Sequence, residues 1–138
     1  MGLARGAYEA ALKYASERET FGKHLAEHQA IQFMLADMAT EIDAARLLTH
    51  RAAWLVDNDR PHVAESAMAK LFASETANRA AHKALQIHGG AGYFRPSKVE
   101  RIYRDQRVTE IYEGTSEIQR LIIARSVLED GNGFTGRP

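Results

Sequence analysis

The chain has 138 residues, of which 45% are hydrophobic and 26% charged, so it is long enough for one globular domain with a buried core. Lysine plus arginine equal aspartate plus glutamate at 18 each, and this zero net charge gives no electrostatic reason to expect nucleic acid or an anionic membrane as a partner. Cysteine is absent, which excludes disulfides, thiol nucleophiles and cysteine-ligated metals. No signal peptide is visible at the start and no uncharged apolar run reaches transmembrane length, so we expect no membrane insertion.

The first element is predicted to be a helix from Gly2 to about Glu19. Its expected buried face follows helical spacing and consists of Leu3, Ala7, Ala10, Tyr14 and Arg18. Gly22 is a natural helix stop. Phe21 is an aromatic residue in this connection, where we expect it either to be buried or to bind something.

The second helix has the clearest pattern in the chain, because its apolar positions alternate steps of four and three residues. These positions are Ile31, Leu35, Met38, Ile42, Ala45, Thr49, Ala52 and Val56. Such a heptad seam is typical of a helix that packs lengthwise in a bundle. Turn-forming residues and a proline end the helix at 57–61.

A third helix is predicted from about His62 to His88, with small residues along much of its seam. The seam comprises Ala64, Ala67, Leu71, Ser74, Asn78, Ala81 and Leu85. Ser74 and Asn78 are polar, so they need hydrogen-bond partners if they are buried.

The remaining chain is predicted to contain a short helix at about 97–104, irregular chain at 105–115, and a last helix at about 116–129, with Pro96 near the start of the short helix. The glycines after position 130 suggest a frayed end. No run of alternating polar and apolar residues indicates a strand. The predicted fold is therefore all-α, an antiparallel four-helix bundle with a short extra helix.

One acid stands out in the stretch 111–120, because Glu113 lies on a loop just before a predicted helix start. Gly114 lets the loop approach a ligand closely. Thr115 or Ser116 can serve as the N-cap, and Ser116 with Gln119 fits a capping box. A carboxylate held there away from water could act as a general base. The alternative is an ordinary helix entry with an exposed acid.

Two other groups allow a ligand interpretation and a structural one. The run 89–92 could cradle a phosphate, with Gln86 adding an amide nearby, or it could simply stop a helix. Arg18 and Phe21 could bracket a pyrophosphate and an adenine, or could form a salt bridge and a core contact. Arg104 and Asp105 are interpreted as a structural pair.

A metal site is not expected. His24 and His28 are four residues apart, but no glutamate is followed by a histidine three residues later, and no His-Glu-x-x-His motif is present.

Taken together, five motifs resemble the C-terminal helical domain of the acyl-CoA dehydrogenases, over nearly the whole chain from Gly2 to about Leu128. In order, the motifs are Arg18-Glu19-Thr20-Phe21-Gly22-Lys23, Glu27-His28-Gln29-Ala30-Ile31-Gln32, Gln86-Ile87-His88-Gly89-Gly90-Ala91-Gly92-Tyr93, Arg104-Asp105 and Ile111-Tyr112-Glu113-Gly114-Thr115-Ser116-Glu117-Ile118-Gln119.

The resemblance implies an enzyme that oxidises an acyl-CoA thioester to the trans-2-enoyl-CoA, with bound FAD and an electron-transfer flavoprotein as electron acceptor. Glu113 matches the family's base, which removes the proton α to the thioester. Tyr112 and Gly114 would contact the substrate. Ile111 and Tyr112, together with the bound flavin, would keep the base away from water.

The resemblance also implies how FAD is held. Thr115 and Glu117 would contact the FAD of their own active site at the start of the last helix. The residues that resemble those holding FAD across a subunit interface are Arg18, Thr20, Phe21, Gln29, Gln86, Gly89 and Gly90. A homodimer or homotetramer is therefore expected.

Residues 1–138 are expected to form one domain, without the N-terminal helical domain and the middle β domain that precede this bundle in the family. The isolated chain should then have little or no dehydrogenase activity, and the acyl chain length of the substrate cannot be read from it. We expect a cytoplasmic protein, or a mitochondrial matrix protein in a eukaryote. The alternative function is a non-catalytic helical oligomerisation or binding module that keeps the fold.

Overall fold

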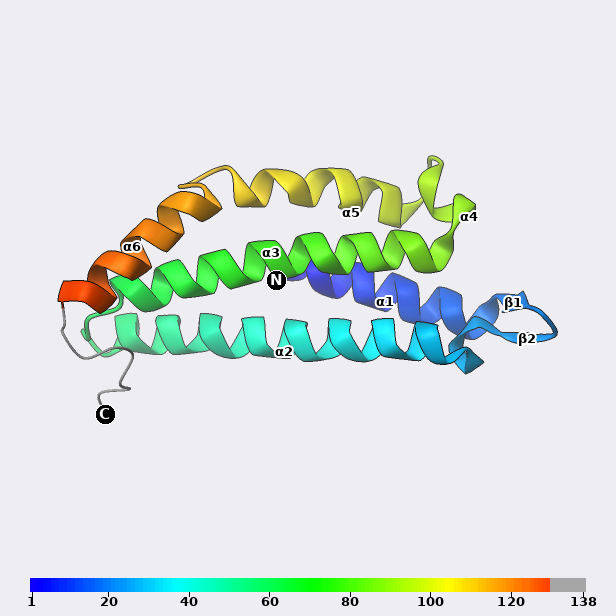
Figure 1. Cartoon of the computed structure of the whole chain (residues 1–138), viewed down its shortest axis with the longest axis horizontal. Coiled ribbons are helices and arrows are strands. Elements are labelled where there is room, and N and C mark those ends of the chain that lie inside the picture. Colours follow the sequence, from blue (N-terminus) through cyan, green and yellow to red (C-terminus); the bar gives the residue numbers. More distant parts are fainter. Residues whose placement is uncertain (130–138) are drawn as a thin grey trace.

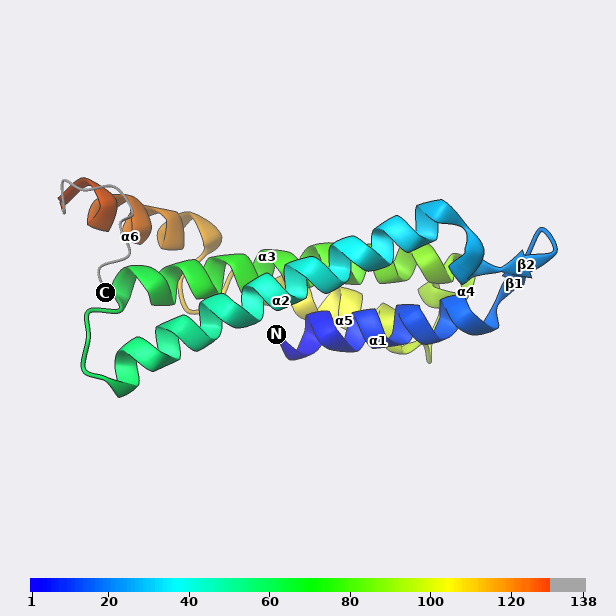
Figure 2. The same cartoon turned by 90° about the horizontal axis from the view of Figure 1, so that it is seen from below.

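Three long helices run side by side, and α3 lies in the middle of the bundle (Figures 1 and 2). The structure is a computed structural model and describes residues 1–129. The helices are α1 Gly2–Glu17, α2 Gln29–Asp57, α3 Val63–His88, α4 Gly90–Tyr93, α5 Lys98–Gln106 and α6 Ser116–Glu129. Two 3₁₀ helices, η1 Leu25–Glu27 and η2 Arg107–Glu110, and two strands, β1 Glu19–Thr20 and β2 Lys23–His24, complete the elements.

The predicted all-α bundle is confirmed, except that two helices together take the place of the fourth helix. Helices α1 and α2 both pack against α3, whereas α5 and α6 share the remaining side of α3 (Figure 1). The predicted irregular chain at 105–115 is wrong over 105–110, because α5 continues to Gln106 and η2 follows directly, and is confirmed over 111–115. The predicted frayed end lies outside the described residues. No helix within 1–129 is long and apolar enough to cross a membrane.

The contact between α1 and α3 is built from alanines. Four alanines of α1 are completely buried, and they belong to the same core cluster as four alanines of α3. The eight residues are Ala4, Ala7, Ala11, Ala15, Ala77, Ala80, Ala81 and Ala84. The predicted face of α1 was therefore slightly rotated: Leu3 and Tyr14 are only partly buried and Arg18 is exposed. Because alanine is short, the two helices approach closely, and the larger side chains are displaced to the edges of the contact.

The heptad seam of α2 is buried along only part of its length. Met38, Ala45 and Ala52 are buried, but Thr49 and Val56 are exposed. The reason is the difference in helix length, since α1 has 16 residues and α2 has 29. Beyond the N-terminus of α1, the second half of α2 is covered mainly by α3 (Figure 2).

A small hairpin joins α1 to the start of α2, so the prediction of no strands was wrong. Glu19–Thr20 pairs antiparallel with Lys23–His24. Phe21 and Gly22 form the two-residue turn with φ values of 52° and 79°, and two positive φ angles are what such a tight hairpin requires. The Phe21 side chain is 98% exposed, so it is not a core residue.

Candidate functional site

The loop that carries Glu113 has an unusual backbone. Glu113 and Gly114 both have positive φ, at 52° and 92°. For glutamate this left-handed conformation costs roughly 1–2 kcal/mol, whereas glycine adopts it freely. A Cβ atom added at Gly114 would lie 2.7 Å from Nε2 of Gln119. The turn therefore needs glycine at position 114 and needs contacts that hold the glutamate in place.

Three hydrogen bonds hold this turn through its backbone carbonyls. Lys70 Nζ donates to Gly114 O at 2.7 Å, and Gln119 Nε2 donates to Glu113 O at 3.2 Å and to Gly114 O at 3.3 Å. The predicted capping box is wrong, because the buried Gln119 amide faces the loop carbonyls. Thr115 caps α6, and its Oγ1 accepts a hydrogen bond from Ile118 N at 3.4 Å.

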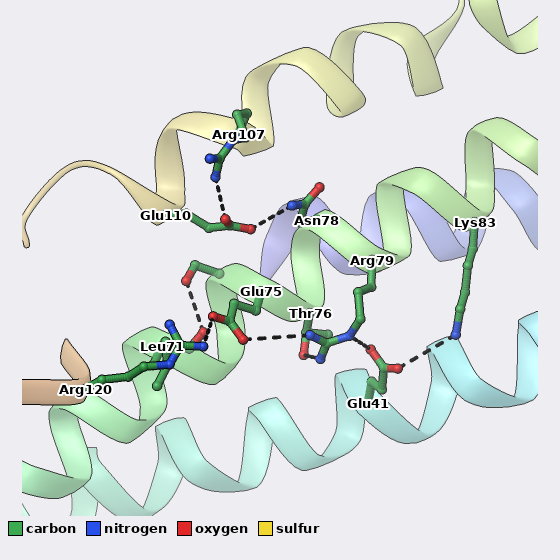
Figure 3. A network of polar contacts seen from close by, with 11 residues as sticks. Glu41, Leu71, Glu75, Thr76, Asn78, Arg79, Lys83, Arg107, Glu110 and Arg120 are labelled. Atoms are coloured by element: carbon green, nitrogen blue, oxygen red, sulfur yellow. Dashed lines mark hydrogen bonds and ion pairs between the residues drawn. The ribbon is translucent and has the colours of Figure 1, made fainter. Parts of the chain in front are cut away.

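Helix α3 also anchors the chain before and after the loop (Figure 3). Asn78 Nδ2 donates to Glu110 Oε1 at 2.8 Å, and Arg120 of α6 forms an ion pair with Glu75. Gln106 Nε2 donates to Asn78 Oδ1 at 2.9 Å. The prediction that buried polar residues of the α3 seam need partners is confirmed at Ser74, which is buried and donates to Leu71 O at 3.1 Å, and the partly buried Asn78 is also bonded.

The carboxylate of Glu113 is exposed on the surface. It forms no hydrogen bond or ion pair with any residue in 1–129. Ile111 and Tyr112 are themselves 53% and 50% exposed, so these two side chains alone do not keep water from the acid. The backbone of Glu113 is therefore held in place, while its carboxylate remains available to a ligand.

Thr115 and Glu117 lie at the start of α6, where backbone N–H groups point toward a ligand or a carboxylate. The backbone N–H of Glu117 and the hydroxyl of Thr115 bond to the Glu117 carboxylate and hold its pKa below the ordinary value. The first turn of α6 thus already stabilises one negative charge, as expected at a helix N-terminus.

A second group of candidate residues lies at the end of the bundle that carries the hairpin (Figure 1). Arg18 is exposed and forms no ion pair within the described part of the chain, and Phe21 is almost fully exposed. The alternative of a salt bridge and a core contact is therefore wrong for this pair. Thr20 lies beside His28, with 3.3 Å between its Oγ1 and His28 Nε2, and Gln29 is exposed at the first position of α2.

The glycine run ends α3 beside an open hollow of about 300 Å³. The hollow is lined by His82, Leu85, Gln86, Gly89, Gly90 and Tyr93. Gly89 has a φ of 56°, which confirms the predicted helix stop, although the one-turn helix α4 follows at once. A Cβ atom added at Gly89 or Gly90 would meet nothing within 4 Å. The backbone here is open to a ligand.

The hollow and the hairpin lie at the same end of the bundle. Tyr14 of α1 stacks on His88 of α3 with ring centroids 4.3 Å apart, which ties the two chain segments together there. The Glu113 loop lies elsewhere, because its anchor Lys70 and the hollow residue Gln86 are sixteen positions apart on α3, or about 24 Å along the helix. The structure thus separates the candidate residues into two groups.

Sequence reasoning missed Lys70 and misassigned Gln119. The lysine contacts a carbonyl that lies 44 residues further along the chain, and no local pattern indicates such a bond. Gln119 was visible in the motif, but its short spacing from Ser116 favoured a local cap.

The structure is an all-α bundle that carries an exposed acid on a loop held by tertiary hydrogen bonds and, apart from that loop, a hollow lined in part by glycines. Comparison with known proteins identifies the class of domain that has these features. The profile of the family described as "Acyl-CoA dehydrogenase, C-terminal domain" matches residues 1–128. The chain belongs to this family.

Individual relatives agree with the family match. The chain is 57% identical over 129 residues to a probable acyl-CoA dehydrogenase, YngJ, of Bacillus subtilis, and 53% identical over 129 residues to subunit CarC of the caffeyl-CoA reductase–Etf complex of Acetobacterium woodii. Each match covers 94% of this chain and 34% of the relative. The solved butyryl-CoA dehydrogenase of Megasphaera elsdenii superposes with a TM-score of 0.91 at 41% identity, covering 92% of this chain and 33% of that one. The chain therefore spans about a third of the length of these relatives.

Proposed function

We propose that this chain is the domain of an FAD-dependent acyl-CoA dehydrogenase that supplies the catalytic base, Glu113, for α,β-dehydrogenation of an acyl-CoA thioester. The observation that carries the proposal is the loop geometry. Glu113 has a left-handed backbone that is held by three side-chain hydrogen bonds to the carbonyls of Glu113 and Gly114, and its carboxylate is exposed and unpaired among residues 1–129. Strained backbone of this kind is characteristic of functional sites.

In this mechanism the Glu113 carboxylate takes the proton from the carbon α to the thioester, and the C–H electron pair becomes part of the new α,β double bond. The hydrogen at the β carbon leaves with its own electron pair. Bound FAD supplies the acceptor for that hydride. Tyr112 and Gly114, which flank the base, would contact the substrate and orient its α carbon, and the Tyr112 ring would help to exclude water when substrate is bound.

The residues at the hairpin end fit a dinucleotide cofactor. The Arg18 guanidinium, which has no ion-pair partner among residues 1–129, is complementary to a diphosphate, and the exposed Phe21 ring offers a stacking face for a purine. The open backbone at Gly89 and Gly90 allows close approach of a ligand. Thr20, Gln29 and Gln86 would add polar contacts from the same end of the bundle.

Thr115 and Glu117 would contact FAD at the other group, beside the base. Because the two groups are about 24 Å apart along α3, we assign them to the FAD molecules of two different active sites. This arrangement requires at least a homodimer, and a homotetramer is compatible with it. Exposed apolar side chains along α2, including Phe33, Leu47 and Trp54, support contact with another copy of the chain. Electron-transfer flavoprotein is the proposed electron acceptor, supported by the similarity to CarC.

The test is Glu113→Gln in a full-length acyl-CoA dehydrogenase that contains this domain. The amide keeps the size of the side chain but cannot accept the proton, so reduction of the flavin by butyryl-CoA in a single turnover should slow by about 10²-fold or more. The visible spectrum should show that FAD is retained.

The matched control is Glu129→Gln, which changes an exposed acid at the other end of α6 and should leave the rate unchanged. If Glu113→Gln reduces its flavin as fast as the parent enzyme, Glu113 is not the base. If the parent full-length protein shows no flavin reduction by an acyl-CoA at all, the alternative function, a non-catalytic helical module, is favoured instead.

A further inference from the structure

We propose that Lys70 is a positioning residue for Glu113, acting through the carbonyl oxygen of Gly114. This inference rests on the proposed function, since it concerns the placement of the base in that reaction. Lys70 lies on α3, far from the Glu113 loop in sequence, and it is partly buried.

The loop depends on bonds from outside itself. Glu113 and Gly114 both have positive φ, and glutamate does not adopt this conformation without support. Neighbouring structure must therefore hold the loop. The carbonyls of Glu113 and Gly114 are the acceptors through which it is held.

Lys70 makes the shortest of these bonds. One nitrogen of the Gln119 side chain is shared between two carbonyls at 3.2 and 3.3 Å, both near the long end of the normal range. Lys70 Nζ donates to Gly114 O at 2.7 Å, and the charge on the donor strengthens the bond. We therefore assign the main restraint on the turn to Lys70.

It also matters for the reaction that Lys70 bonds a backbone carbonyl and not the Glu113 carboxylate. Lys70 forms no ion pair with an acid within residues 1–129, and in particular none with the neighbouring Glu113. A cation bonded directly to the carboxylate would stabilise its charged form and weaken it as a base. By bonding the backbone instead, Lys70 places the carboxylate and leaves it free.

Helix α3 is a rigid support for this bond. It is the central helix of the bundle, and buried residues next to Lys70 include Ala67, Ala69 and Ser74. Asn78 and Glu75 on the same helix hold the chain before and after the loop (Figure 3). Loss of the Lys70 bond should therefore loosen residues 113–115 and leave η2 and α6 in place.

The first experiment measures loop structure by NMR in the 138-residue chain with Lys70→Met, which keeps the apolar stem and removes the donor. The amide resonances of residues 113–115 should shift, and they should broaden as the loop samples more than one conformation. Lys70→Arg, which retains a charged donor, should restore both. Lys83→Met is the matched control, because it removes a lysine of α3 that bonds Asp37 and Glu41 of α2, away from the loop. Its loop signals should match the parent chain.

The second experiment measures steady-state kinetics in the full-length enzyme. A displacement of about 1 Å can slow a reaction by about 10²-fold, so Lys70→Met should lower kcat by about 10- to 100-fold. KM should change by less than about twofold, and Lys70→Arg should recover most of the rate. A variant that was only destabilised would lose activity in proportion to unfolded protein, which thermal denaturation of the same samples reports.

The outcomes separate the two proposals. If Glu113→Gln abolishes flavin reduction while Lys70→Met keeps the parent kcat, Lys70 is not a positioning residue. If Lys70→Met leaves the NMR signals of the loop unchanged, Lys70 does not restrain the loop and the inference is overturned. If Glu113→Gln reacts normally, the proposed function fails, whatever the loop signals show.

Discussion

Gly92 is the position at which one added methyl group should damage this fold most clearly. It is a buried residue of α4, and a Cβ atom there would lie 2.6 Å from His88 Cβ, 3.0 Å from Val99 Cγ2 and 3.3 Å from Leu85 Cδ1. The closest of these atoms cannot rotate away, because the position of the His88 Cβ is fixed by the backbone of α3. The backbone of α4 must therefore move away from α3.

Overpacking of this kind costs about 1–3 kcal/mol, and the contact with a Cβ atom places Gly92→Ala toward the upper part of that range. For a domain of this size, a loss of about 2–3 kcal/mol lowers Tm by about 8–12 °C. The assay is urea denaturation followed by circular dichroism, in which the midpoint should fall and the slope should stay constant.

The control is Gly90→Ala, two residues earlier, where an added Cβ meets nothing within 4 Å and the backbone φ is not positive. Its stability should stay within about 0.5 kcal/mol of the parent chain. Equal midpoints for the two variants, or a Gly92→Ala midpoint like that of the parent chain, would refute the packing argument.

Two further predictions concern the polar contacts around the Glu113 loop. Asn78→Ala removes both a donor to Glu110 and an acceptor for the buried Gln106 amide, so it should lower the free energy of unfolding, measured by urea denaturation, by about 1–3 kcal/mol. The control Asn58→Ala removes an exposed hydrogen bond and should cost less than about 1 kcal/mol in the same titration. A larger loss for Asn58→Ala than for Asn78→Ala would contradict the reasoning. Glu117 has a lowered pKa in the folded chain, so its contribution to stability is present above its unfolded pKa and is lost as the pH falls through the lower folded pKa. From about pH 5 downward the parent chain should therefore lose stability more steeply than Glu117→Gln, and parallel curves would show that the carboxylate contributes nothing.

Local sequence patterns predicted most of the fold because helix formation depends on neighbours three and four residues away. The heptad seam placed α2, and Gly89 marked the end of α3. The same patterns failed at the Phe21–Gly22 hairpin, where two strand residues on each side are too few to show alternation. On α1 they found Ala7 but missed Ala4, Ala11 and Ala15, since hydrophobicity does not report which face approaches a neighbour closely.

At the candidate site, the motif around Glu113 predicted a loop, a glycine, and a cap at either Thr115 or Ser116, and the structure uses Thr115. The predicted partner of Gln119 was wrong. A capping box with Ser116 and a tertiary hydrogen bond to the carbonyls of Glu113 and Gly114 compete for the same amide, and the burial of Gln119 against the loop favours the tertiary bond.

The sequence by itself determined that this chain is a helical bundle with an acid on a glycine-containing loop, because those features are set by spacing and by the conformational freedom of single residues. Only the tertiary structure decided what holds that acid. The Lys70 bond joins residues 44 positions apart, and it forms because helix packing brings α3 against the loop, a result of the whole core that no short stretch of sequence contains.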